Sequence, residues 1–392
     1  METWKRTVYI SLVCVFCTAF GVSQLAPILP LYFHDLGVQT PEAMSLWSGL
    51  ATGATYIIVC LAAPFWGRVA DKKGRKITLI RSSFGMALCN ILIAFQTTPE
   101  GVVLIRLVQG LVSGFYSASI TLIASESPIE RTGWALGLLA SANLAGSLIG
   151  PLLGGYIADT VGIRNDFIIV GTLMGLAGVL ATIFIHENYV PQPNPEKLSI
   201  RKLKEQIPEF NSIVALCVAS FIYAICIMSL QPVISVYIKG IVPSDTENLA
   251  FIAGAVFSAM GIAQLMSSSP LGKLVDKIGP RKVLVVSLIY VGILNIPQAY
   301  VSDVYQLAII RFLQGFGLGG MLPALNTYLS SKTPREFTGQ VFSYNQSCLF
   351  LGYFLGAVGG ASLMAWLGFT TLFWVSGGLF IIYALWIGFK LK

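Results

Sequence analysis

About twelve apolar runs, each of about 20 residues or more, divide most of this sequence. A membrane-spanning helix needs about 20 consecutive apolar residues, and charged residues make up only 11% of the chain, against about 25% in soluble domains. A cleaved signal peptide is the alternative for the first run, but its apolar length and the runs behind it favour a retained helix. The sequence therefore predicts an all-α, polytopic membrane protein with twelve transmembrane helices, near residues 8–33, 46–66, 78–96, 102–123, 134–158, 166–186, 211–237, 249–270, 283–300, 304–328, 340–366 and 370–389.

The positions of Lys and Arg predict the orientation of these helices. If both termini lie on one side of the membrane, that side holds 21 of the 25 Lys and Arg residues. Basic residues in short loops stay in the cytoplasm, so both termini are expected there. The net charge of +7 then reflects topology and attraction to the lipid bilayer, and no nucleic-acid partner is expected.

The sequence is also duplicated. Equivalent residues in the two halves lie 205 positions apart, as in the pairs Gly67 and Gly272, Pro27 and Pro232, and Arg106 and Arg311. We therefore expect two pseudo-symmetric six-helix bundles, residues 1–186 and 211–392, joined by a polar, proline-rich cytoplasmic linker at 187–210.

Two groups of polar residues in the first half are candidates for a functional role. Arg106, in an R-x-x-Q-G run, would cost about 2.5 kcal/mol or more in the bilayer unless it faces a polar interior. A coupling or structural role and simple snorkelling towards the membrane surface are both open. His34 and Asp35, at the outer end of the first helix, are either a solvated helix end or a proton-handling pair.

The fifth predicted helix carries glycines at positions i, i+4 and i+8. Such a stripe lets a second helix approach closely, and the proline within it adds a bend. The residues of this run are Gly146, Gly150, Pro151, Gly154 and Gly155.

Together these features resemble the major facilitator superfamily, and the resemblance covers essentially the whole chain. Its motifs here are a G-x-x-x-D-x-x-G-R-K turn after the second helix, R-x-x-Q-G in the fourth and G-x-x-x-G-P-x-x-G-G in the fifth. The last is similar to the motif of 12-helix drug:proton antiporters, and the runs at 64–67, 133–137 and 342–347 are similar to the bacterial MdtG-like multidrug efflux branch. The resemblance implies alternating access by a monomer in a bacterial cytoplasmic (inner) membrane.

The resemblance also implies a gate at the cytoplasmic face. In the family, the acid of the turn is held against the end of the eleventh helix while the inside is closed, and a helix dipole favours such an acid by about 0.3 to 1 kcal/mol. The expected gate residues are Gly67, Asp71, Gly74, Arg75, Lys76 and Glu126, with Gly272 and Asp276 in the second half.

The expected function is secondary active export of amphipathic organic compounds in exchange for protons. No phosphate loop for ATP occurs in the sequence. An apolar, aromatic-rich cavity suits varied lipophilic ligands better than a sugar or an anion. Its expected lining is Gln24, Tyr56, Tyr116, Asn143, Tyr223, Gln231, Gln264, Asn326 and Gln346.

Two alternatives remain open: an exporter of one native metabolite, such as a siderophore, and a membrane enzyme or receptor. Against the second, two histidines and seven cysteines scattered through predicted helices form no catalytic or metal cluster, so no enzyme activity, metal or cofactor is expected.

Proton coupling requires a group that binds protons. All eighteen acidic residues are predicted at helix ends or in loops, where Asp35, Glu126 and Asp159 lie nearest the membrane. These acids and His34 are therefore the expected proton carriers, and Arg106, His34 and Asp35 the expected coupling residues.

Overall fold

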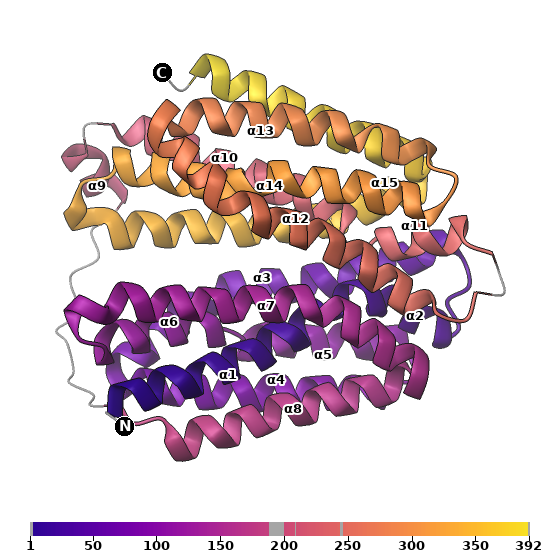
Figure 1. Ribbon diagram of the computed structural model, residues 1–392, viewed down its shortest axis with the longest axis horizontal. Coiled ribbons are helices and arrows are strands. Elements are labelled where there is room, and N and C mark those ends of the chain that lie inside the picture. The colour runs from indigo at the N-terminus through magenta and orange to yellow at the C-terminus, as the bar shows by residue number, and fades with distance from the viewer. Residues whose placement is uncertain (1–2, 188–199, 208, 244–245, 391–392) are drawn as a thin grey trace. The chain divides into compact units, whose positions relative to one another are not determined.

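The computed structural model describes residues 3–187, 200–207, 209–243 and 246–390, and every regular element within those ranges is a helix (Figure 1). The chain divides into two compact units. The first comprises Met1–Gln39, Leu50–Asn194 and Asp245–Ala255, and the second Thr40–Gly49, Pro195–Ser244 and Val256–Lys392. Most of the predicted linker lies outside the described residues, so the domain boundaries 1–186, 187–210 and 211–392 stay a prediction.

The first unit holds the helices of the N-terminal half. They are α1 (Thr3–Ser23), α2 (Leu25–Asp35), most of α3 (Pro41–Lys73), α4 (Arg75–Ala94), α5 (Pro99–Val112), α6 (Phe115–Glu126), α7 (Ile129–Val161) and α8 (Ile163–Phe184).

The second unit holds those of the C-terminal half. They are α9 (Ile200–Gln206), α10 (Phe210–Leu230), α11 (Ile234–Ile241), most of α12 (Leu249–Ile278), α13 (Pro280–Asn295), α14 (Val304–Lys332) and α15 (Thr338–Lys390), with short 3-10 turns at Pro297–Tyr300 and Arg335–Phe337.

Within the described ranges, eleven helical stretches are long and apolar enough to cross a membrane, by length and composition. The last of them, α15, has 53 residues and would extend about 80 Å, more than twice the hydrocarbon thickness of a bilayer. Gly368, with φ of 80°, divides α15 into two helices. The predicted all-α architecture with twelve spans is therefore confirmed.

Some of the spans consist of two shorter helices. Pro27 has no N–H with which to bond the carbonyl of Ser23, and α1 ends at Ser23 while α2 begins at Leu25. Pro232 lies in the equivalent joint between α10 and α11. Gln24 is therefore the residue at the joint between the two helices of the first span.

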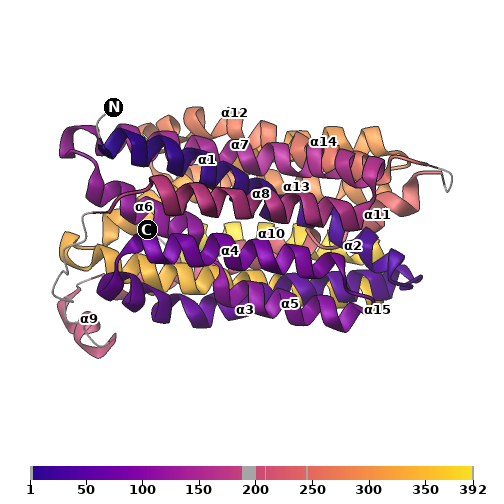
Figure 2. The same cartoon turned by 90° about the horizontal axis from the view of Figure 1, so that it is seen from below.

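In the first unit, α8 packs against both α4 and α1, and α1 also packs along α7 (Figures 1 and 2). The contacts of α1 with α6 and α7 bury Val8, Cys14, Val15, Phe115 and Leu139. Because α1 lies between α7 and α8, side chains from both of these helices meet at its C-terminal joint.

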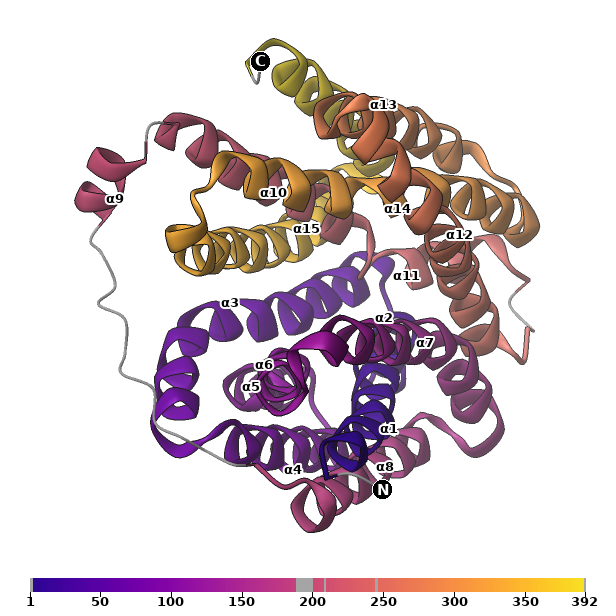
Figure 3. The same ribbon diagram turned by 60° about the vertical axis from the view of Figure 1, so that its left-hand side comes forward.

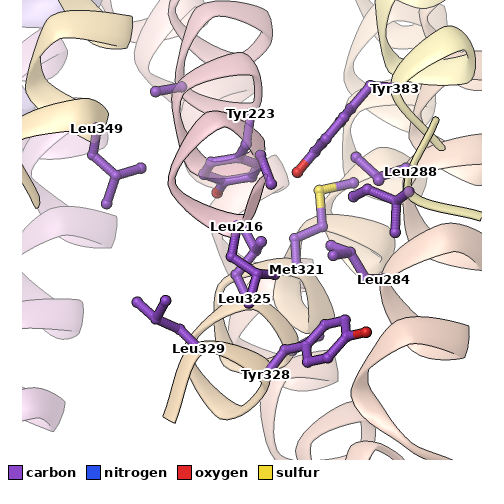
Figure 4. Packing of buried hydrophobic residues seen from close by; sticks show 14 of the residues in the cluster. Leu216, Tyr223, Leu284, Leu288, Met321, Leu325, Tyr328, Leu329, Leu349 and Tyr383 are labelled. Carbon is purple, nitrogen blue, oxygen red and sulfur yellow. The ribbon is translucent and has the colours of Figure 1, made fainter. Parts of the chain in front are cut away.

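In the second unit, α10 packs along α15, and α13 packs against α14 and α15 (Figure 3). Buried side chains from these helices form one cluster that includes Tyr223, Leu284, Leu288, Met321 and Tyr383 (Figure 4). Tyr223, which was expected to line a substrate cavity, is only 3% exposed and belongs to this packed cluster.

Candidate functional site

A buried acid lies in the membrane-spanning part of the first unit. Asp166, in the first turn of α8, has no exposed surface. Its carboxylate Oδ2 accepts a hydrogen bond of 3.0 Å from Nε2 of Gln24, and its Oδ1 has no hydrogen-bond partner. In the described part of the chain, no cation forms an ion pair with this carboxylate.

Gln24 occupies the joint between α1 and α2. Its side chain is also completely buried, and its Oε1 has no hydrogen-bond partner. The backbone bonds that span the joint, from Gln24 N to Phe20 O and from Ile28 N to Gln24 O, are long, at 3.3 and 3.4 Å. Asp166 is therefore hydrogen-bonded to a residue at the break between α1 and α2.

The glycine stripe on α7 brings the α1 joint close to that helix. A Cβ added at Gly146 or Gly150 would lie 2.5 Å from Phe16 O or 2.6 Å from Phe20 O. At Gly154 an added Cβ would lie 2.6 Å from the Cβ of Gln24 and collide with its amide oxygen. The predicted close approach along this stripe is confirmed, and it fixes the position of Gln24 from the α7 side.

An aromatic pair adjoins the acid. Tyr32 of α2 and Phe167 of α8 meet edge to face with ring centroids 5.1 Å apart, and the Tyr32 hydroxyl donates a hydrogen bond of 2.8 Å to Ile93 O. Both side chains are fully buried. The backbone next to Asp166 is therefore held in place by a packed aromatic pair.

The second unit repeats this arrangement without the acid. Tyr237, 205 positions after Tyr32, packs on Phe373 with ring centroids 5.2 Å apart, and its hydroxyl donates a hydrogen bond of 2.7 Å to Gln298 O. When the halves are aligned on Phe167 and Phe373, which lie 206 positions apart, Leu372 corresponds to Asp166, and it is 1% exposed. The second unit therefore packs an apolar side chain at the position of the buried acid.

The residues expected to carry protons lie elsewhere. His34 and Asp35 at the end of α2 are 3.9 Å apart, with side chains 37% and 56% exposed. The carboxylate of Asp159 accepts hydrogen bonds from the backbone N–H groups of Ala250 and Phe251, at 3.1 and 2.7 Å. In these positions all three groups differ from Asp166, which has no exposed surface.

The predicted gate turn is held by an acid that the sequence analysis did not single out. Glu187, just after α8, accepts hydrogen bonds from the backbone N–H groups of Arg75 and Lys76, at 2.7 and 2.8 Å. A carboxylate at the N-terminus of α4 satisfies two donors that the helix leaves unpaired. Gly74, which precedes α4, has φ of 92° and packs directly against this carboxylate.

The other predicted gate residues are dispersed. The side chain of Asp71 lies outside the part of the chain that the structure describes. Gly67 and Asp276 are exposed, whereas Gly272 and Glu126 are partly buried. Their gate role stays a prediction.

Arg106 is satisfied within its own unit. It is 7% exposed, and its Nε donates to Ala51 O at 3.3 Å while its NH1 donates to Oε1 of Gln109 at 2.6 Å. Tyr56, another predicted cavity residue, is close enough to interact electrostatically with it. The arginine therefore ties α5 to α3, and a coupling role for it is a prediction.

Of the predicted cavity residues, Gln231 lines a cavity of about 100 Å³ inside the second unit, beside Arg311 and Gln314. Gln24 is instead bonded to Asp166. The remaining members are exposed or partly buried on their own helices: Tyr116, Asn143, Gln264, Asn326 and Gln346.

Comparison with known proteins identifies the family. The family model described as Major Facilitator Superfamily matches residues 11–241 and 216–391. The chain is 38% identical to the multidrug resistance protein MdtG of Dickeya zeae over 99% of this chain and 96% of that protein. It is 37% identical to the MdtG of Salmonella typhimurium over 97% and 94%.

Solved structures agree on the fold. The nucleoside transporter NupG aligns over 100% of both chains with a TM-score of 0.80 at 12% identity. The human organic anion transporter MFSD10 aligns over 99% of this chain and 100% of that one, with a TM-score of 0.72 at 16% identity. From the family model, the relatives and the twelve-span architecture, we conclude that this chain is a multi-pass membrane protein of the major facilitator superfamily.

Proposed function

We propose that this protein exports amphipathic organic compounds from the cytoplasm of a bacterium in exchange for protons, as a monomer in the inner membrane with both termini in the cytoplasm. The names of its relatives support the class of substrate. The distribution of Lys and Arg supports the orientation. The observation that carries the proposal is the buried pair of Asp166 and Gln24.

Burial without a cation makes Asp166 suited to carry a proton. An ionised carboxylate enclosed by apolar groups is costly unless it is paired, and Asp166 has one amide donor and one oxygen without a partner. In this closed arrangement the carboxyl is accommodated as the neutral acid. It can lose its proton when the surroundings open to water.

The joint at Gln24 links that opening to a helix movement. A broken membrane helix keeps free backbone groups beside its proline and bends there more easily than elsewhere. Bending of α1 against α2 would withdraw the amide of Gln24 and expose Asp166 to one side of the membrane. Proton release and the change of access would then be one event, which is what antiport requires.

Transport into inverted membrane vesicles tests the proposal. Addition of an exported compound should collapse a pre-formed pH gradient with the wild-type protein. Asp166→Asn should lose this proton flux and uphill transport, while counterflow of labelled substrate without a pH gradient persists. Asp35→Asn is the matched control, because this acid is exposed, and it should keep proton flux.

Two results would contradict the proposal. If Asp166→Asn transports uphill at the wild-type rate, the proton is carried elsewhere. If the wild type moves a panel of amphipathic compounds without any change in the pH gradient, the coupling to protons is wrong.

A further inference from the structure

The two halves of the chain treat their equivalent arginines differently. Arg311 of α14 lies 205 positions after Arg106 and is 3% exposed. Arg106 donates to a backbone carbonyl and to Gln109, whereas the Nε of Arg311 has no hydrogen-bond partner. The only acceptor that the described residues give Arg311 is the sulfur of Met260, 3.8 Å from its NH1.

The glutamine that should serve Arg311 is bonded to other residues. Gln314, equivalent to Gln109, donates to Oδ1 of Asn295 at 2.9 Å and accepts from Nε2 of Gln298 at 3.2 Å. Both of its polar atoms are therefore used in a buried amide network with Asn295 and Gln298. This network leaves the guanidinium of Arg311 without the partner that its duplicate has.

A cavity lies beside this guanidinium. Its volume is about 100 Å³, which is room for about three water molecules. Arg311 and Gln231 are its polar contributors other than Gln314, and apolar side chains supply most of the rest, among them Phe257, Met260 and Phe380. In the first unit Tyr56 approaches the arginine, whereas Gly261 occupies the equivalent position here and adds no ring.

We infer that Arg311 and this cavity form a subsite for the anionic head group of an amphipathic substrate, a carboxylate or sulfonate, whose size the cavity matches. A guanidinium binds such oxyanions through paired N–H donors. Buried arginines are normally paired, and here the Phe257 ring 5.7 Å from the Arg311 Cζ is the other favourable neighbour. This inference rests on the proposed export of amphipathic compounds and narrows their class.

Two fluorescent probes that differ by one charged group test the subsite: 1-anilinonaphthalene-8-sulfonate and its uncharged parent N-phenyl-1-naphthylamine. Their affinities are measured for the full chain in phosphatidylcholine nanodiscs, above the signal of empty nanodiscs. The wild type should prefer the sulfonate. Arg311→Gln should weaken sulfonate binding tenfold or more and change binding of the uncharged probe by less than about twofold.

Variants and competitors separate this from a loss of folding. Arg311→Lys keeps a charge and should retain part of the preference, and Arg106→Gln should leave the ratio of the two affinities unchanged. With the wild type alone, naphthalene-1-sulfonate should displace the bound probe, whereas its neutral isostere naphthalene-1-sulfonamide should not. Equal displacement by the two competitors would overturn the inference. So would an equal loss of affinity for both probes in Arg311→Gln.

Anionic phospholipid has the same head-group chemistry and must be distinguished. If phosphatidylglycerol in the nanodiscs abolishes sulfonate binding by the wild type, and if this competition requires Arg311, then lipid is the occupant and the assignment to a substrate is wrong. If the binding preference depends on Arg311 but no proton flux accompanies transport, the subsite stands and the proposed coupling fails. If proton flux occurs and the preference is independent of Arg311, only the subsite fails.

Discussion

Replacing Gly150 with alanine should destabilise the first unit, whereas the same change at Gly137, on the same helix, should not. An added Cβ at Gly150 lies 2.6 Å from the backbone oxygen of Phe20 and collides with the hydroxyl of Ser23. At Gly137 no atom lies within 4 Å of the added group. Comparison of the two variants separates the effect of packing α1 on α7 from the effect of alanine's helix propensity, which both variants share.

The size of the effect follows from two opposing terms. Alanine favours a helix over glycine by up to about 1 kcal/mol, and overpacking a close contact costs about 1 to 3 kcal/mol. A backbone oxygen cannot move aside like a side chain, so the cost at Gly150 falls in the upper part of that range. We expect the two variants to differ by about 2 to 3 kcal/mol in unfolding free energy.

Thermal unfolding of the purified protein measures this difference. For a unit of about 190 residues, each kcal/mol shifts the midpoint by about 2 to 4 °C, so Gly150→Ala should melt roughly 4 to 12 °C below Gly137→Ala. It should also transport more slowly, because α1 carries Gln24. Equal midpoints for the two variants would refute the close packing that we derive for the stripe.

Three further changes give distinct outcomes. Asp166→Leu, which copies Leu372 of the second unit, should cost about 1 to 3 kcal/mol in unfolding free energy, because it leaves the buried Nε2 of Gln24 without its acceptor, and it should abolish proton-driven transport in vesicles. Glu187→Gln should cost about 0.5 to 2 kcal/mol of capping energy and raise amide hydrogen exchange in the first turn of α4 but not in α8. Glu209→Gln should change the unfolding free energy by no more than about 1 kcal/mol, because the Glu209 side chain, 2.6 Å from Lys332, is half exposed.

The spans and their duplication could be predicted because they depend on local patterns. Apolar runs of sufficient length, prolines at 27 and 232, and the glycine spacing on α7 each have a direct structural consequence. The close approach at Gly150 was found where the glycine spacing placed it. Such features need no knowledge of distant partners.

The buried acid was missed because hydropathy does not report depth within a bundle. Asp166 stands at the start of the sixth predicted span, where an acid reads as a helix end, and its partner Gln24 is 142 positions away. Gln24 itself was interpreted as a cavity residue. The duplication could have indicated this acid. When the halves are aligned on the aromatic residues Phe167 and Phe373, Asp166 corresponds to the apolar Leu372.

The distinct environments of the two arginines were equally hidden. The R-x-x-Q-G run is identical in the two halves, so the sequence predicts equal surroundings for Arg106 and Arg311. Their difference arises from Asn295 and Gln298, which draw Gln314 away. Which hydrogen bonds a glutamine chooses depends on packing of α13 against α14, and no local motif encodes that.

The central claim is that Asp166 takes up and gives up the transported proton, and difference infrared spectroscopy tests it most directly. Binding of an exported compound to the purified protein should remove a carbonyl band of a protonated carboxylic acid and produce a carboxylate band. Both bands should be present in the wild type and in Asp35→Asn, and absent in Asp166→Asn. Bands that persist in Asp166→Asn, or a wild-type carboxyl whose protonation is the same with and without substrate, would contradict the account.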